Sequence, residues 1–104
     1  MKELKLAEAH ATAGRLADAE TVLRQILKAD ANQPDALGAL AAIAANVGKL
    51  DVAIALQERA LAARPNASLF RSNLAEMYRR HAEAQPSAEA EAALRRALEL
   101  APHR

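Results

Sequence analysis

The feature that most constrains the fold is a spacing of 34 residues that recurs along the 104-residue chain. Gly14 and Gly48 lie 34 positions apart, and Ala7, Ala41 and Ala75 keep the same interval. A fixed period of this length indicates stacked copies of one supersecondary unit, because a single copy cannot bury its own apolar face. We therefore expect a helical repeat and not one closed bundle.

Composition supports helices as the repeating elements. Hydrophobic residues make up 52% of the chain, yet there is one Phe, one Tyr and no Trp, and alanine dominates. Alanine is the best helix former, and its small side chain lets helices approach closely. The formal net charge of +1 supplies no long-range field for gathering nucleic acid, and the absence of cysteine excludes disulfides and thiolate metal sites.

Helical spacing of apolar residues recurs throughout the chain. Six helices are expected, over residues 2–13, 16–29, 34–47, 50–63, 68–82 and from Ser87 to the end. Gly14 and Gly48 make turns, and Pro65 cannot continue a helix. Ala90 follows Ala53 by 37 residues and not 34, so we expect an inserted turn that contains His81.

These elements form one domain of three helix pairs, with repeats at approximately 1–33, 34–67 and 68–104. Small residues recur at matching places in the two helices of each pair: Ala7, Ala41 and Ala75 in the first, and Ala19, Ala53 and Ala90 in the second. We expect the paired helices to touch there. A bulky side chain at any of these positions should cost about 1–3 kcal/mol by overpacking.

This pattern resembles the tetratricopeptide repeat. The residues that carry the resemblance are Leu40, Ala41, Gly48, Ala53, Ala60 and Pro65 in the second repeat, Leu6, Ala7, Gly14 and Ala19 in the first, and Leu74, Ala75, Tyr78, Ala90, Ala97 and Pro102 in the third. The resemblance implies an all-α fold, an α-α superhelix that forms a right-handed solenoid of three hairpins. The family's large aromatic early in each leading helix is missing here, and Phe70 is expected to fill that space in the third repeat.

Two stretches, GRLADAE (14–20) and RPNASLFRSNLAEMYRR (64–80), also resemble the repeats of bacterial multidomain proteins of the O-GlcNAc transferase type. This second resemblance implies that the chain could be a non-catalytic piece of a larger glycosyltransferase-like protein.

The family's geometry implies a concave groove lined by the leading helices, which would bind another protein or peptide. The groove positions are Lys5, Glu8, Thr12, Gly38, Ala39, Ala42, Ala45, Asn46, Asn73, Glu76, Arg79 and Arg80. The bare middle strip favours close approach of a helix or an extended backbone, although alanine is abundant everywhere in this chain. Arg79 and Arg80 would either grip an acidic partner or simply complement the helix dipole.

A second interpretation concerns the last helix, because the end of a solenoid needs a polar outer face. Leu94, Leu98 and Leu100 predict an apolar edge there, covered by another copy or by further chain. Self-association into a homo-oligomer, through this edge or through the alanine-lined groove, is therefore the alternative to a peptide-binding scaffold.

Nothing in the sequence indicates an enzyme, a metal or a cofactor. His10 is interpreted as a core residue, since no two histidines lie three or four residues apart on one helix. The serines lack a nucleophile pattern, and the glycines form no phosphate-binding loop. The N-terminal segment MKELKLAEAH has no apolar signal-peptide core, and the longest apolar run, 39–45, is too short to span a membrane. We expect a cytoplasmic protein, or a piece of a larger one.

Overall fold

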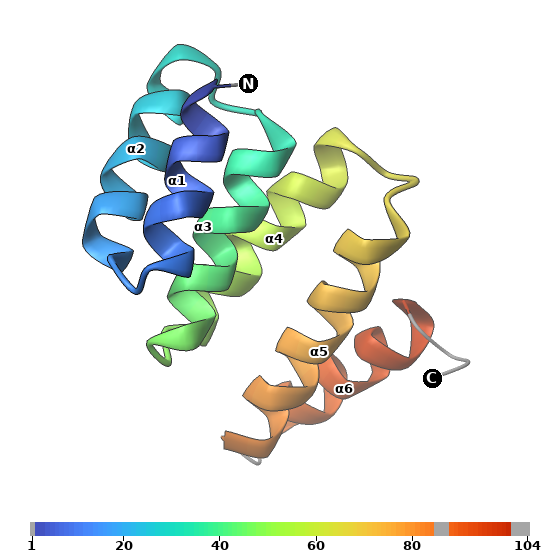
Figure 1. Cartoon of the computed structure of the whole chain (residues 1–104). Coiled ribbons are helices and arrows are strands. Elements are labelled where there is room, and N and C mark those ends of the chain that lie inside the picture. The colour runs from blue at the N-terminus through green and yellow to red at the C-terminus, as the bar shows by residue number, and fades with distance from the viewer. Residues whose placement is uncertain (1, 85–87, 101–104) are drawn as a thin grey trace.

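The structure is a computed structural model that describes residues 2–84 and 88–100. Over those residues the chain forms helices and no strands (Figure 1). The helices are α1 (Lys2–Thr12), α2 (Leu16–Ala29), α3 (Pro34–Asn46), α4 (Leu50–Ala63), α5 (Ser68–Ala84) and α6 (Ala88–Leu100). The expected start of the last helix at Ser87 lies outside the described residues.

The helices pack as three successive hairpins. α1 lies against α2, α3 against α4, and α5 against α6, while α3 packs on α2 of the preceding hairpin and α5 packs on α4 (Figure 1). Each hairpin therefore contacts its neighbour in sequence, and the molecule is elongated, with extents of 40 × 27 × 22 Å. The expected fold class, an all-α helical repeat of three hairpins, is confirmed.

The first two hairpin turns use the same glycine-based helix ending. Gly14 and Gly48 have φ values of 82° and 83°, a conformation that other residues rarely adopt. The N–H groups of Gly14 and of the next residue, Arg15, donate to the carbonyls of Ala11 and His10, at 3.0 and 2.8 Å. This is the Schellman motif, and it satisfies carbonyls that the helix end would otherwise leave open.

The third hairpin lacks this signal and behaves differently. Ala82 stands 34 residues after Gly48, and because alanine favours a helix, α5 continues to Ala84. The expectation that His81 belongs to the inserted turn is therefore wrong, and residues 85–87 lie outside the described residues. His81 lies within α5, and its Nε2 is 2.8 Å from Oδ1 of Asp51 at the start of α4.

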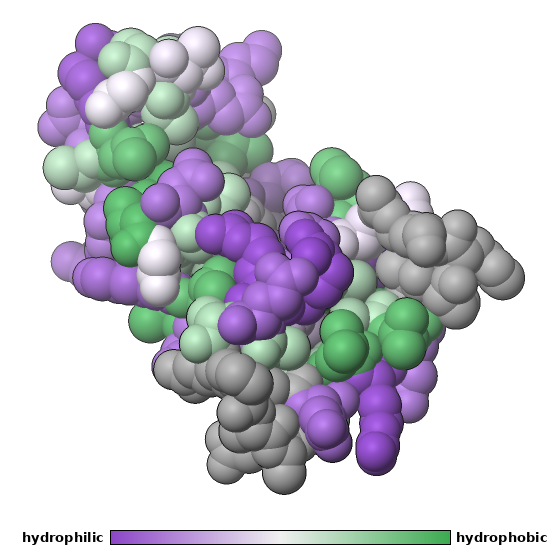
Figure 2. All heavy atoms as spheres, turned by 90° about the horizontal axis from the view of Figure 1, so that it is seen from below, coloured by the Kyte–Doolittle hydropathy of each residue, from purple (hydrophilic) through white to green (hydrophobic). Residues whose placement is uncertain are grey.

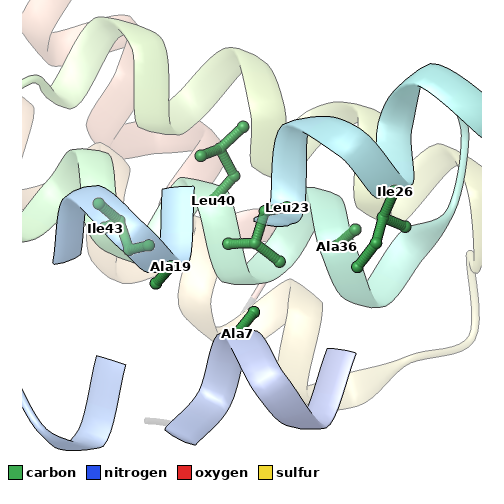
Figure 3. Close-up of a cluster of buried hydrophobic side chains, with 7 residues drawn as sticks. All are labelled: Ala7, Ala19, Leu23, Ile26, Ala36, Leu40 and Ile43. Atoms are coloured by element: carbon green, nitrogen blue, oxygen red, sulfur yellow. The ribbon is translucent and has the colours of Figure 1, made fainter. Parts of the chain in front are cut away.

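The repeated alanines lie where the helices of a pair meet. Ala7, Ala19, Ala41 and Ala53 are each at most 2% exposed, and Ala75 is 7% exposed. Figure 3 shows Ala7 of α1 facing Ala19 and Leu23 of α2, with α3 closing the same cluster. The prediction that small residues permit this contact is confirmed at these five positions, while the side chain of Ala90 lies outside what the structure describes.

Phe70 joins the second and third hairpins. Its ring lies over α3, where a Cβ atom added to Gly38 would come within 3.3 Å of Cε1. The ring is 8% exposed and packs with Leu37 and Ala60. Gly38 thus permits the close approach of Phe70 to α3. That Phe70 replaces the family's missing aromatic stays a prediction.

Candidate binding face and C-terminal hollow

The residues predicted to line the groove differ in exposure. The exposed ones are Lys5, Glu8 and Thr12 on α1, Ala42 and Asn46 on α3, and Asn73, Glu76, Arg79 and Arg80 on α5. Gly38 and Ala39 are half-buried, whereas Ala45 is buried. The open surface on α3 is therefore narrower than the sequence suggested.

Ala45 requires a correction. Its side chain is 5% exposed and packs in a cluster with Ala41, Ala53 and Met77, so it belongs to the core and not to a groove wall. The reason is that α5 lies across this part of the second hairpin. Gly38 is covered in the same way by the ring of Phe70.

The two arginines near the end of α5 are both engaged within the chain. Arg79 donates to the carboxylates of Glu76 and Glu83, and the hydrogen bond to Glu76, followed by the two negative charges, raises the pKa of Arg79 above its ordinary value. Arg80 donates from Nη2 to the backbone carbonyl of Ala45 at 3.3 Å. An acidic ligand would have to compete with these partners, so the structure offers the acidic-partner prediction little support.

A hollow of about 440 Å³ lies between α5 and α6 at the C-terminal end of the stack. It is lined by Ser72, Asn73, Ala75, Glu76 and Arg79 of α5 and by Leu94, Ala97 and Leu98 of α6. Several predicted groove residues of α5 thus share one depression with the predicted apolar edge of α6. Sequence reasoning treated the two as separate surfaces.

The apolar edge is only partly as predicted. Leu94 and Leu98 are 42% and 60% exposed, whereas Leu100 is half-buried against the cluster that contains Leu74 and Tyr78. Figure 2, which views the molecule from below, shows hydrophobic surface exposed on that side. The exposed edge therefore consists of two leucines, one helical turn apart.

One polar cluster was not predicted from the sequence. The hydroxyl of Tyr78 on α5 donates to the carboxylate of Glu58 on α4, and Nη1 of Arg96 on α6 lies 3.7 Å from the same carboxylate. Burial, reinforced by Glu58, raises the pKa of Tyr78 above its ordinary value of 10.0. The residues are 20 and 38 positions from Glu58 in sequence, so no local pattern could reveal the cluster.

His10 is half-buried, and its Nδ1 accepts a hydrogen bond from Nε of Arg15 at 3.0 Å. Over residues 2–84 and 88–100, no three His, Asp or Glu side chains gather in a way that could hold a metal ion. In the same residues no helix is both long and apolar enough to cross a bilayer.

Stacked hairpins with an open face of small and polar residues define the class of helical-repeat scaffolds. The family model described as tetratricopeptide repeat matches residues 3–43. No curated protein matches the chain.

A solved structure shares this architecture along almost the whole chain. It is the type III secretion translocator chaperone SycD of Yersinia enterocolitica, with a TM-score of 0.75 and 24% sequence identity. The match covers 99% of this chain and 69% of that one. At this identity the likeness shows a shared fold of the tetratricopeptide type. Neither comparison bears on the resemblance to O-GlcNAc transferases, which stays a prediction.

Proposed function

We propose that this chain is a tetratricopeptide-type scaffold that binds a segment of another protein along the face formed by α1, α3 and α5. The proposal treats residues 1–104 as one unit of three repeats in the cytoplasm. It is supported by the fold, by the family match over residues 3–43, and by a neighbour in fold that is described as a chaperone.

The observation that carries the proposal is that buried and exposed side chains alternate along α3. Ala41 is fully buried, whereas the adjacent Ala42 is exposed, and Asn46, one turn further on, is also exposed. A methyl group projects little from a helix, so a ligand backbone or helix can approach α3 closely at Ala42. The exposed amides of Asn46 and Asn73 can then donate to and accept from that backbone.

The charges beside this strip indicate which kind of segment fits. Lys5 and Glu8 are exposed on α1 with opposite signs, and the carboxylate of Glu76 is bonded to Arg79 on α5. The positive and negative charges on this face nearly balance, and Arg79 is already paired with the carboxylate of Glu76. We therefore propose an extended or helical segment without a large net charge as the ligand, because a strongly acidic one would have to displace Glu76 from Arg79.

A peptide-display selection on the purified chain tests the proposal. Peptides from a random library would be selected, synthesised with a fluorophore, and titrated with wild type and with two variants. Ala42→Glu fills the strip at an exposed site and should weaken binding at least tenfold. Val52→Glu is the matched control, since Val52 is 48% exposed on α4, and it should leave affinity unchanged. Circular dichroism would show that both variants keep their helices.

Amide chemical-shift mapping with the same peptides locates the contact directly. Shifts concentrated on Ala42, Asn46 and Asn73 would support the proposal. Selection of no peptide, equal affinity of the Ala42→Glu variant, or shifts confined to the outer face of α2 and α4 would each overturn it.

A further inference from the structure

The hollow between α5 and α6 corresponds, by repeat position, to a surface of the second hairpin. Six of its residues are Ser72, Ala75, Arg79, Leu94, Ala97 and Leu98. Subtracting the repeat offsets of 34 for α5 and 37 for α6 gives Gly38, Ala41, Ala45, Gln57, Ala60 and Leu61. The two sets are therefore equivalent faces of the third and second hairpins.

In the second hairpin α5 covers most of this face; the equivalents of the remaining lining residues, Asn73 and Glu76, are Ala39, which is half-buried, and Ala42, which is exposed. Gly38 lies under the ring of Phe70, and Ala60 is in the same cluster as that ring. Ala45 packs in a cluster with Met77, and Nε2 of Gln57 donates to the carbonyl oxygen of Phe70 at 3.1 Å. The occupant of such a face is thus the leading helix of the next hairpin, which contributes Phe70 and Met77 here.

We infer that α1 of a second copy of this chain docks in the C-terminal hollow, so that copies associate head to tail. This inference does not rest on the proposed function, although Asn73 belongs to both surfaces, because its test measures association between copies and not the binding of a foreign segment.

The opposite end of the chain carries the matching surface. Leu40 of α3 and Leu74 of α5 occupy the same repeat position, are 4% and 3% exposed, and lie in clusters with residues of the preceding hairpin. Leu6 is their equivalent in α1 and is 50% exposed. Because residues 2–84 and 88–100 of a single chain supply both a leading helix with an exposed leucine and a hollow equivalent to the face that α5 covers, a second copy is the occupant that the structure itself provides.

The sizes of the facing residues are also compatible. In the internal interface a large side chain meets a small one, with Phe70 over Gly38 and Met77 packed with Ala45. By repeat position, the end-to-end contact would place Lys2 against Ser72 and Ala9 against Arg79. Each pair again joins one long side chain with one small residue, so neither position brings two large side chains together.

Head-to-tail docking predicts how the average mass of the assembly depends on protein concentration. Docking α1 into the hollow joins two different surfaces. Each added copy therefore presents its own hollow to the next copy, and the assembly can keep growing. The average mass should therefore rise continuously with concentration and not level off at a dimer.

Sedimentation equilibrium on the full chain tests this with two single variants. Leu6→Asp charges the α1 surface, and Leu98→Asp charges the hollow. Both side chains are at least half exposed, so the fold should tolerate the changes, which circular dichroism would verify. Each variant alone should reduce the association constant at least tenfold, while Val52→Asp, an exposed apolar site on α4, should not alter it.

Mixing the two variants gives the decisive result. The Leu6→Asp chain keeps an intact hollow and the Leu98→Asp chain keeps an intact α1, so an equimolar mixture should form a 1:1 dimer and nothing larger. Association of the Leu6→Asp chain as strong as wild type would show a hollow-to-hollow contact and overturn the inference. A wild-type monomer at every concentration up to the millimolar range would also overturn it, leaving the hollow to a helix of a different protein.

Discussion

Substitution of Ala41 by leucine tests whether close helix contact sets the limits of this fold. Ala41 is 0% exposed and lies in a cluster with Ala44, Ala45 and Met77. Leucine places a branched hydrocarbon chain where that cluster holds a methyl group. Overpacking of this kind typically costs 1–3 kcal/mol, so we expect a loss of about 2 kcal/mol.

The size of the effect on melting follows from the length of the chain. An unfolding entropy of about 2.1 cal/mol/K per residue amounts to about 0.22 kcal/mol/K for 104 residues. A loss of about 2 kcal/mol should therefore lower Tm by about 9 °C. The measurement is thermal unfolding followed by circular dichroism, repeated at several protein concentrations so that self-association does not distort the comparison.

Ala42→Leu is the matched control, because the same change is made one residue further along α3 at an exposed position. Leucine and alanine have similar helix propensities, so the free energy of unfolding should change by no more than about 0.5 kcal/mol. Equal melting temperatures for the two variants would refute this reasoning, because only Ala41 is enclosed by neighbouring side chains while Ala42 is exposed.

A double-mutant cycle identifies the neighbour responsible. Met77→Ala removes volume from the same cluster, so the Ala41→Leu/Met77→Ala double variant should be more stable than the sum of the two single losses predicts. If the free-energy losses of the two single variants simply add, the leucine at position 41 must instead clash with another part of the helix pair.

Two further predictions concern polar groups between the hairpins. Gln57 is 1% exposed and, within the described residues, its Oε1 has no hydrogen-bond partner, while Leu23 and Leu94 stand at the equivalent positions. Gln57→Leu removes the unpaired oxygen together with the hydrogen bond from Nε2 to the carbonyl of Phe70, but that carbonyl keeps its partner within α5. The variant should therefore be more stable by about 1 kcal/mol in urea unfolding, and a loss of that size would show that the hydrogen bond outweighs the unpaired oxygen. Tyr78 is the only tyrosine, so its absorbance reports its ionisation, and its midpoint should lie above pH 10.0 and fall in a Glu58→Gln variant. Because the pKa of Tyr78 is raised in the folded state, the protonated hydroxyl contributes its full stabilisation below pH 10.0. That contribution is lost as the pH rises through the pKa of Tyr78 in the folded protein, and Tyr78→Phe should remove this pH dependence.

The sequence by itself determined the helices and their order. The 34-residue spacing, the turn glycines and the recurring alanines are local signals, and α2 and α4 begin and end where those signals predict. The buried state of Ala7 and Ala41 followed from the same repetition, because a position that recurs in every copy meets the same neighbour in each. The end of α5 was misjudged because a missing glycine does not end a helix, and Ala82 lets it continue.

Only the tertiary structure decided which of the repeated positions are open. Gly38 and Ala45 occupy groove positions by repeat number, yet α5 covers both through Phe70 and Met77, which differ from their counterparts in the other repeats. The merging of the α5 face with Leu94 and Leu98 into one hollow likewise depends on how two helices lie against each other. Periodicity specifies which face of a helix is turned inward, whereas burial at an interface depends on the actual size and position of the side chain that arrives from the next hairpin.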